Sequence, residues 1–171
     1  MVRRPGLAET VERLSGTWGG SGRWTTPDGK SRAFLDHREI GPGAGAALTL
    51  RTNLSWPEGE DAPFYEELAA LSTLPSDDAL RLQLMSPQGR ARVLTGRLER
   101  ESGDGIRLAF AGASRTRDAD PLETLGEQIE VTLTLRDGEL VWTFTSTADF
   151  YGLADHTHRL VSVLRRGDPE A

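Results

Sequence analysis

The chain has 171 residues, 37% of them hydrophobic and 27% charged, a composition that predicts one globular domain over residues 1–171. A net charge of −6 argues against nucleic acid as a partner, and the lack of cysteine excludes disulfides, thiolate metal sites and a cysteine nucleophile. We find neither a secretory signal nor an apolar run long enough to span a membrane, so we expect a cytoplasmic protein.

The N-terminal residues predict a short helix followed by a strand. Apolar residues spaced i, i+4 and i+7 give a helix over residues 6–14 one apolar face, formed by Leu7, Val11 and Leu14. Gly16 ends this helix, and a strand follows through Trp24. Large and small residues alternate on one face of that strand, which suits a barrel interior. This face carries Trp18, Gly20, Gly22 and Trp24.

The next segment combines a clear turn with an irregular strand. Thr26-Pro27-Asp28-Gly29 has turn chemistry, because proline sets the first φ and glycine accepts the positive one. The strand over about residues 31–40 alternates poorly, and Gly41-Pro42-Gly43 is expected to break it. Asp36 and Arg38 share a face of this strand. We expect an edge strand with both charges in water, or alternatively a buried pair that contacts a polar ligand.

The strand over residues 46–56 has the clearest alternation of the chain. Every second residue is apolar or small, which is the period of a strand with one buried face. That face carries Ala46, Leu48, Leu50, Thr52, Leu54 and Trp56.

Residues 57–78 predict a helical insertion, centred on a helix over about 61–72. Asp61 is its expected cap and Pro63 stands in its first turn. Its buried stripe would consist of Phe64, Leu68 and Leu71. Such an insertion would plug one end of a barrel or cover a sheet edge.

The remaining chain predicts further strands joined mostly by short turns. These strands cover about 79–86, 90–100, 105–113 and 156–166, together with a hairpin that turns at Asp137-Gly138. Segments 114–125 and 149–155 are expected to be loops. We therefore predict an all-β fold, an antiparallel up-and-down barrel of about nine or ten strands with a short N-terminal helix and one inserted helix. A β-sandwich is the alternative.

Two segments resemble the calycin-type barrels, which include the lipocalin-like families, and in particular their nitrobindin-like branch. Leu14-Ser15-Gly16-Thr17-Trp18-Gly19-Gly20-Ser21-Gly22 is similar to the opening strand of that branch, and His158-Arg159-Leu160-Val161-Ser162-Val163-Leu164-Arg165 to its closing strand. The resemblance implies haem b in the barrel mouth with His158 as axial ligand, and handling of nitric oxide and peroxynitrite. The expected Tyr-Pro pair is absent, and Trp24-Thr25-Thr26-Pro27 stands in its place.

His156 and His158 form the most suggestive local pair. Two residues apart on a strand, their rings project from the same face. An imidazole in an apolar cavity can bind haem iron, or the pair can join His37 and Glu39 in a non-haem metal site. In the third interpretation, both rings are half in water at the beginning of a strand.

The inward faces predict a ligand site lined by Trp18, Trp24, Trp56, Trp142, Phe144 and Ser162. The same aromatic residues would serve equally well as packing in a solid core. The favoured function is binding of a small hydrophobic ligand without catalysis, with segments 61–72, 114–125 and 149–155 at the entrance. The alternatives are a nitrobindin-like haem protein, which as an enzyme would be a peroxynitrite isomerase, and a packed barrel used for protein contacts. Neither the ligand's identity nor the oligomeric state follows from the sequence.

Overall fold

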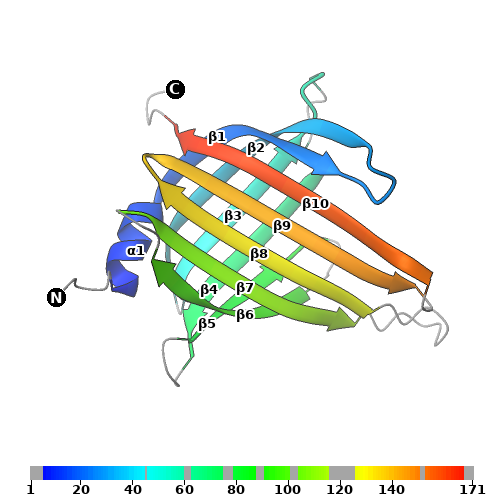
Figure 1. Ribbon diagram of the computed structural model, residues 1–171. Coiled ribbons are helices and arrows are strands. Elements are labelled where there is room, and N and C mark those ends of the chain that lie inside the picture. The colour runs from blue at the N-terminus through cyan, green and yellow to red at the C-terminus, as the bar shows by residue number, and fades with distance from the viewer. Residues whose placement is uncertain are drawn as a thin grey trace.

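The fold of the chain is given by a computed structural model, which describes residues 6–44, 46–59, 63–74, 79–87, 91–100, 104–115, 126–150 and 153–167. Within these residues one helix, α1 (Leu7–Leu14), precedes ten strands (Figure 1). The strands are β1 (Gly16–Thr25), β2 (Ser31–Gly43), β3 (Ala46–Ser55), β4 (Tyr65–Thr73), β5 (Ala79–Met85), β6 (Ala91–Arg100), β7 (Ile106–Arg115), β8 (Gly126–Arg136), β9 (Glu139–Phe150) and β10 (Leu153–Arg166).

The strands form a closed antiparallel barrel. Each strand pairs with its neighbours in the chain, and β1 also pairs with β10 (Figure 1). In this closing seam Gly20 lies opposite Leu164 and Gly22 opposite Ser162. Among the described strands, closure leaves no free sheet edge. It confirms the predicted up-and-down barrel and excludes the sandwich.

The barrel core follows from the alternation of each strand. In β5, Leu80, Leu82 and Leu84 are buried, whereas Arg81 and Gln83 between them are exposed. A strand places successive side chains on opposite faces, so every second residue of a barrel strand points inward. Inward residues from all ten strands join into one hydrophobic core, among them Ile40 of β2, Leu71 of β4 and Leu164 of β10.

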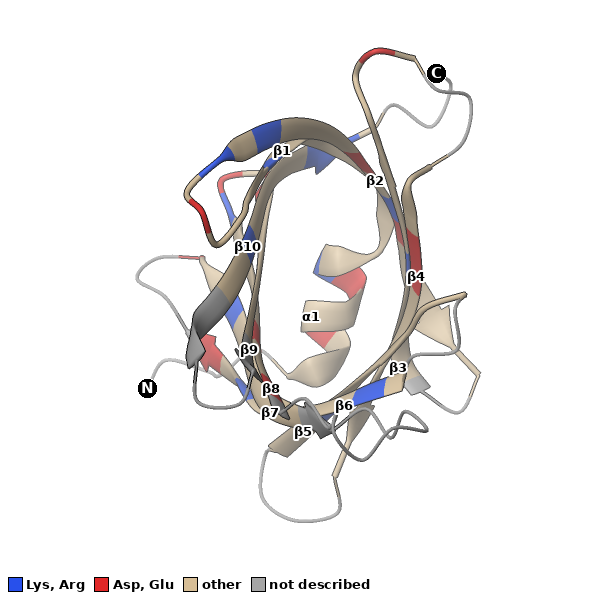
Figure 2. Cartoon of the chain, turned by 90° about the vertical axis from the view of Figure 1, so that its right-hand side faces the viewer, with Lys and Arg blue, Asp and Glu red and all other residues tan. Residues whose placement is uncertain are grey.

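Helix α1 lies across one end of the barrel, behind the ring of strands in Figure 2. Leu14 is buried, and Leu7 and Val11 pack against the core. The indole Nε1–H of Trp18 donates to the carbonyl oxygen of Leu14 at 2.8 Å, which ties β1 to the end of the helix. The predicted helix is confirmed. It closes one end of the barrel, and we call the opposite end the mouth.

The predicted β8–β9 hairpin is confirmed residue for residue. Asp137 and Gly138 both have positive φ, 51° and 79°, as the two central residues of a primed turn require. The turn aligns the apolar sets of the two strands on one face. The resulting cross-strand pairs are Leu135 with Leu140, Leu133 with Trp142, and Val131 with Phe144.

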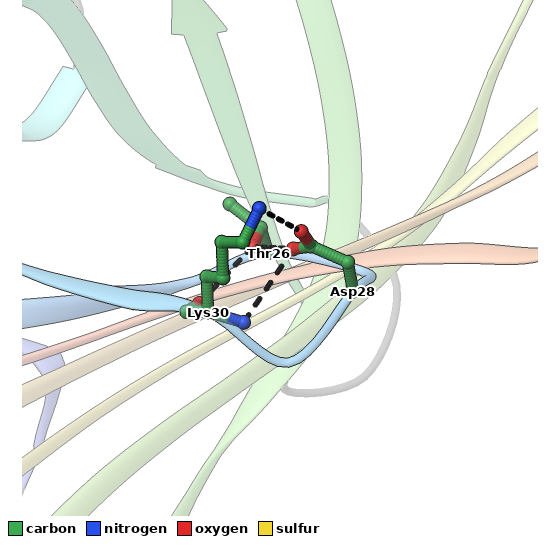
Figure 3. A network of polar contacts seen from close by, with 3 residues as sticks. All are labelled: Thr26, Asp28 and Lys30. Carbon is green, nitrogen blue, oxygen red and sulfur yellow. Dashed lines mark hydrogen bonds and ion pairs between the residues drawn. The ribbon is translucent and has the colours of Figure 1, made fainter.

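The predicted turn between β1 and β2 is held by a small polar network (Figure 3). The hydroxyl of Thr26 donates to the carboxylate of Asp28, and the Lys30 ammonium lies 2.9 Å from the same carboxylate. These contacts lower the pKa of Asp28, and the hydrogen bond from Thr26 has the largest effect. Gly29 has a φ of 80°, as the turn chemistry requires.

The predicted helical insertion over 57–78 is wrong, because this segment contributes strand β4. Leu68 is 54% exposed on the outside of the barrel, between its strand partners Arg51 and Met85. Ala69 and Leu71 are buried, so the burial period is two. Hydrogen bonds to β3 on one side and β5 on the other decide this outcome. The Asp61 cap falls outside the described residues, among which no helix is long and apolar enough to cross a membrane.

The predicted break after residue 40 and the 149–155 loop are also revised. Strand β2 continues through Gly41 to Gly43, with a register irregularity where it pairs with β3. Strand β9 extends to Phe150 and β10 begins at Leu153, so both enter the predicted loop. Of the predicted loop over 114–125, residues 116–125 lie outside the described residues.

Candidate functional site

A cavity of about 370 Å³ occupies the half of the barrel nearest the mouth. Trp24 of β1 and His158 of β10 line it. Trp24 is the strand partner of Leu160, and His158 is the strand partner of Ser146 in β9. At the other end of β1, Trp18 contacts α1. Small-molecule sites usually enclose about 300–1,000 Å³, so this cavity is large enough for a ligand. The interior is therefore hollow at this end, and the alternative prediction of a barrel packed throughout is wrong.

The structure brings most of the predicted ligand-binding residues together. The cavity walls include Trp24, Trp142, Phe144, His158 and Ser162. Trp18 does not join them, because it is fully buried in the core beneath α1. Trp56 stands beside the walls, stacked on Phe64 with ring centroids 3.9 Å apart. The side chain of His156 lies outside the described residues.

Aromatic rings gather at the mouth. Trp24 stacks on Trp56 with ring centroids 6.3 Å apart and an interplanar angle of 21°. The guanidinium of Arg32 covers the Trp56 ring at 3.5 Å from its centroid. Flat apolar surfaces of this kind suit a flat or oily ligand.

His158 is held in the cavity wall by Trp24. The Trp24 indole Nε1–H donates to Nδ1 of His158 at 3.2 Å, and the ring centroids are 5.8 Å apart. A neutral imidazole carries one proton and one free nitrogen lone pair. Because Nδ1 accepts this hydrogen bond, the proton of neutral His158 resides on Nε2. Trp24 thus fixes both the position and the tautomer of the histidine.

The predicted non-haem metal site, with His37 and Glu39 as ligands, is wrong. His37 and Glu39 are exposed on the outside of β2, whereas His158 lines the cavity. Side chains on opposite faces of the barrel wall cannot share one ion. No group of three or more His, Asp or Glu side chains placed to hold a metal ion occurs among the described residues.

A buried ion pair lies at the base of the cavity, contrary to the expectation that these charges face water. Asp36 and Arg38 are 2% and 3% exposed. Arg38 donates from Nε and Nη2 to the two carboxylate oxygens of Asp36 at 2.9 and 2.8 Å. Its guanidinium also covers the Trp142 ring at 3.9 Å from the centroid. Two parallel hydrogen bonds and one ring face fix the guanidinium plane.

A second polar group near the mouth was missed by the sequence analysis. The Tyr65 hydroxyl donates to Glu67 at 2.5 Å, and Arg92 pairs with Glu127 at 3.1 Å. The hydroxyl of Ser146 also donates to Glu127. Burial raises the pKa of both Glu67 and Tyr65.

The alternation of inward and outward residues in β6 and β8 could have predicted that two members of this polar group, Arg92 and Glu127, point inward. Arg92 precedes the inward Leu94 by two residues, and Glu127 stands in the same relation to Ile129. Both strands therefore continue their inward face into charged positions. Glu67 carried no such signal, because its segment was interpreted as a helix.

The raised pKa of Glu67 predicts a stability that depends on pH. In the folded state Glu67 keeps its proton at pH values where the unfolded chain has lost it, so this group stabilises the fold most below its ordinary pKa of 4.5. The contribution is lost as the pH rises through the folded-state pKa. Glu67→Gln keeps an oxygen acceptor for Tyr65 and should flatten the decline of stability above pH 4.5. Urea unfolding at a series of pH values measures the effect.

Glu66→Gln is the matched control for this measurement. Glu66 is the neighbour of Glu67 in β4, and it is exposed. Its replacement should leave the pH dependence of the unfolding free energy as in the wild type. Equal slopes for wild type and Glu67→Gln would contradict the prediction.

Taken together, a closed barrel with a helix across one end and an aromatic cavity at the other defines a ligand-binding β-barrel. The model of the THAP4-like, heme-binding beta-barrel domain family matches residues 8–166, and the chain belongs to this family. The nitrobindin-like resemblance is thereby confirmed.

Solved structures support the same fold. Eleven chains match, among them a crystal structure of Rv2717c from M. tuberculosis. That structure superposes with a TM-score of 0.67 at 21% sequence identity, and the match covers 95% of this chain and 98% of the other. At this identity the likeness concerns the fold alone. A search of the curated proteins found no match.

Proposed function

We propose that the protein binds haem b in the mouth of its barrel, with His158 as the axial ligand. The observation that carries the proposal is the place of His158, whose imidazole lines the cavity beside the Trp24 ring. Membership of a haem-binding family supports it. Bound haem would supply an iron centre for small ligands such as nitric oxide, the chemistry that the nitrobindin resemblance implies.

The residues of the mouth fit a porphyrin, with one condition. Phe144, Leu160 and Leu54 offer apolar walls to a flat ring. His158 is the nitrogen donor, but its free lone pair accepts the hydrogen bond of Trp24. A neutral imidazole has no second lone pair to offer iron. Loading the barrel would therefore require Trp24 to release Nδ1 of His158, so that iron could be held by Nδ1 itself or, after the proton moves from Nε2 to Nδ1, by Nε2.

Titration with haemin tests the proposal. Wild-type protein should give a shifted Soret band that saturates, and His158→Ala should weaken binding by about 100-fold or more. This estimate follows because losing even an outer partner of a metal ligand costs about 10–100-fold. His37→Ala, on the outside of β2, is the control and should bind haemin as the wild type does.

In the same titration, Trp24→Phe should change the affinity for haemin in the opposite direction from His158→Ala. It removes the competing hydrogen bond and keeps an aromatic ring, so haemin should bind about two- to tenfold more tightly. A wild type without a Soret shift, or an undiminished His158→Ala, would refute haem binding at this residue.

Binding of a small hydrophobic molecule without iron is the second candidate function. The Trp24–His158 hydrogen bond favours it, because it occupies the lone pair that a metal would need. Native mass spectrometry of freshly purified protein distinguishes the two. A retained organic molecule without iron would support this candidate, and a mass increment equal to haem would support the first.

A further inference from the structure

Two buried polar atoms at the inner end of the cavity have no hydrogen-bond partner. They are Nη1 of Arg38 and the hydroxyl oxygen of Ser162, in side chains that are 3% and 1% exposed. Both residues line the cavity. Buried polar groups in folded proteins are almost always paired, so unpaired polar atoms in two residues of a cavity wall point to an occupant that pairs with them.

The two residues are neighbours of the same tryptophan. The Arg38 guanidinium covers the ring of Trp142, and Trp142 is the direct strand partner of Ser162 across β9 and β10. Asp36 occupies the other edge of the guanidinium with two hydrogen bonds, so Nη1 remains as the free donor. The arginine therefore offers a fixed N–H group.

Gly22 gives Ser162 its room. A Cβ atom on Gly22 would lie 2.8 Å from the Ser162 hydroxyl oxygen and 2.3 Å from the Phe34 ring. Only the absent side chain at this position lets Phe34 and Ser162 lie over β1. The hydroxyl thus forms part of a fitted wall, two residues deeper along β10 than Leu160.

The charges around the cavity define what kind of occupant fits. Within the described part of the chain, Arg38 is paired with Asp36 and Arg92 with Glu127. Glu67 is a further carboxyl in the wall, bonded by Tyr65. Among the described residues of the cavity wall, a carboxylate would meet no unpaired cation, and it would add a charge near Glu67. The free N–H group and the hydroxyl are matched instead by a neutral oxygen acceptor.

We propose that the inner end of the cavity binds the carbonyl oxygen of a small, neutral, apolar molecule, on Arg38 Nη1 and the Ser162 hydroxyl. The apolar part of the molecule lies against Trp142, Phe144 and Leu160. The Ser162 hydroxyl serves as a donor to this oxygen. The inference does not rest on haem binding, because the site is deeper than His158 and is tested in haem-free protein.

Calorimetric titration with three ligands of similar size tests the proposal. Acetophenone carries the carbonyl, ethylbenzene lacks it, and benzoate carries a charge in its place. Acetophenone should bind about 5- to 100-fold more tightly than ethylbenzene, the ratio expected for two hydrogen bonds, and benzoate should bind more weakly than either. Equal affinity for acetophenone and ethylbenzene would mean that the polar atoms hold water only. Tighter binding of benzoate would make the site an anion site, and either result overturns the proposal.

Ser162→Ala separates binding from folding. Removing an unpaired buried hydroxyl should leave the melting temperature of the ligand-free protein unchanged or higher, while the preference for acetophenone over ethylbenzene falls. Ser86→Ala is the control, because the Ser86 hydroxyl is also buried without a partner but does not line the cavity. It should leave both affinities unchanged. An undiminished preference in Ser162→Ala would contradict the assigned role.

Discussion

Replacing Asp36 with asparagine should lower the free energy of unfolding by about 3–5 kcal/mol, because it leaves a buried guanidinium without its counter-charge. Asp36 is 2% exposed and accepts two hydrogen bonds from Arg38. Asparagine keeps the shape of the side chain and one acceptor oxygen. The decrease in unfolding free energy therefore measures mainly the loss of the negative charge. Urea unfolding, followed by tryptophan fluorescence, measures it.

An exposed ion pair provides the control for this result. Arg165 and Glu139 approach to 2.6 Å, with side chains that are 77% and 41% exposed. Glu139→Gln should cost less than about 1 kcal/mol, the usual upper value for a surface pair. The double variant Asp36→Leu with Arg38→Met should be more stable than Asp36→Asn, since it removes both charges. An Asp36→Asn protein as stable as the wild type would show that the guanidinium does not depend on this carboxylate.

The barrel was predictable because, in most strands, the sequence of the strand alone shows which residues are buried. Leu80, Leu82 and Leu84 show a period of two that no helix shares, and Asp137-Gly138 sets the register of its hairpin. Strand β4 was not predictable in the same way. Phe64, Leu68 and Leu71 also have helical spacing, and only the flanking strands β3 and β5 decide that Leu68 faces outward.

The candidate site depends on contacts that no local pattern contains. The hydrogen bond that sets the His158 tautomer comes from Trp24, which is 134 residues earlier in the chain. Asp36 and Arg38 look like a solvated pair until barrel closure places Trp142 over the guanidinium. The family resemblance identified His158 as a candidate ligand, but its surroundings follow from the closed barrel alone.

Replacing Gly20 with alanine should lower the free energy of unfolding by about 3 kcal/mol or more, at or above the upper end of the usual cost of overpacking. Gly20 lies in the seam between β1 and β10, opposite Leu164. An added Cβ atom would stand 2.1 Å from the carbonyl oxygen of Val163 and 3.1 Å from the Cα atom of Leu164. Both atoms belong to the backbone, so no side-chain rotation relieves the clash. Relief requires the two strands to separate at the point where the barrel closes.

Gly19→Ala distinguishes this clash from a general cost of adding a methyl group to β1. Gly19 is the adjacent residue, and a Cβ atom there would meet nothing within 4 Å. Its replacement should leave the unfolding free energy within about 0.5 kcal/mol of the wild type. Near-ultraviolet circular dichroism adds a structural readout, because separation at the seam would disturb Trp18 and Trp24 on the same strand. If Gly20→Ala and Gly19→Ala unfold at the same urea concentration, the seam tolerates a side chain, and close approach of the two backbones is not what this position requires.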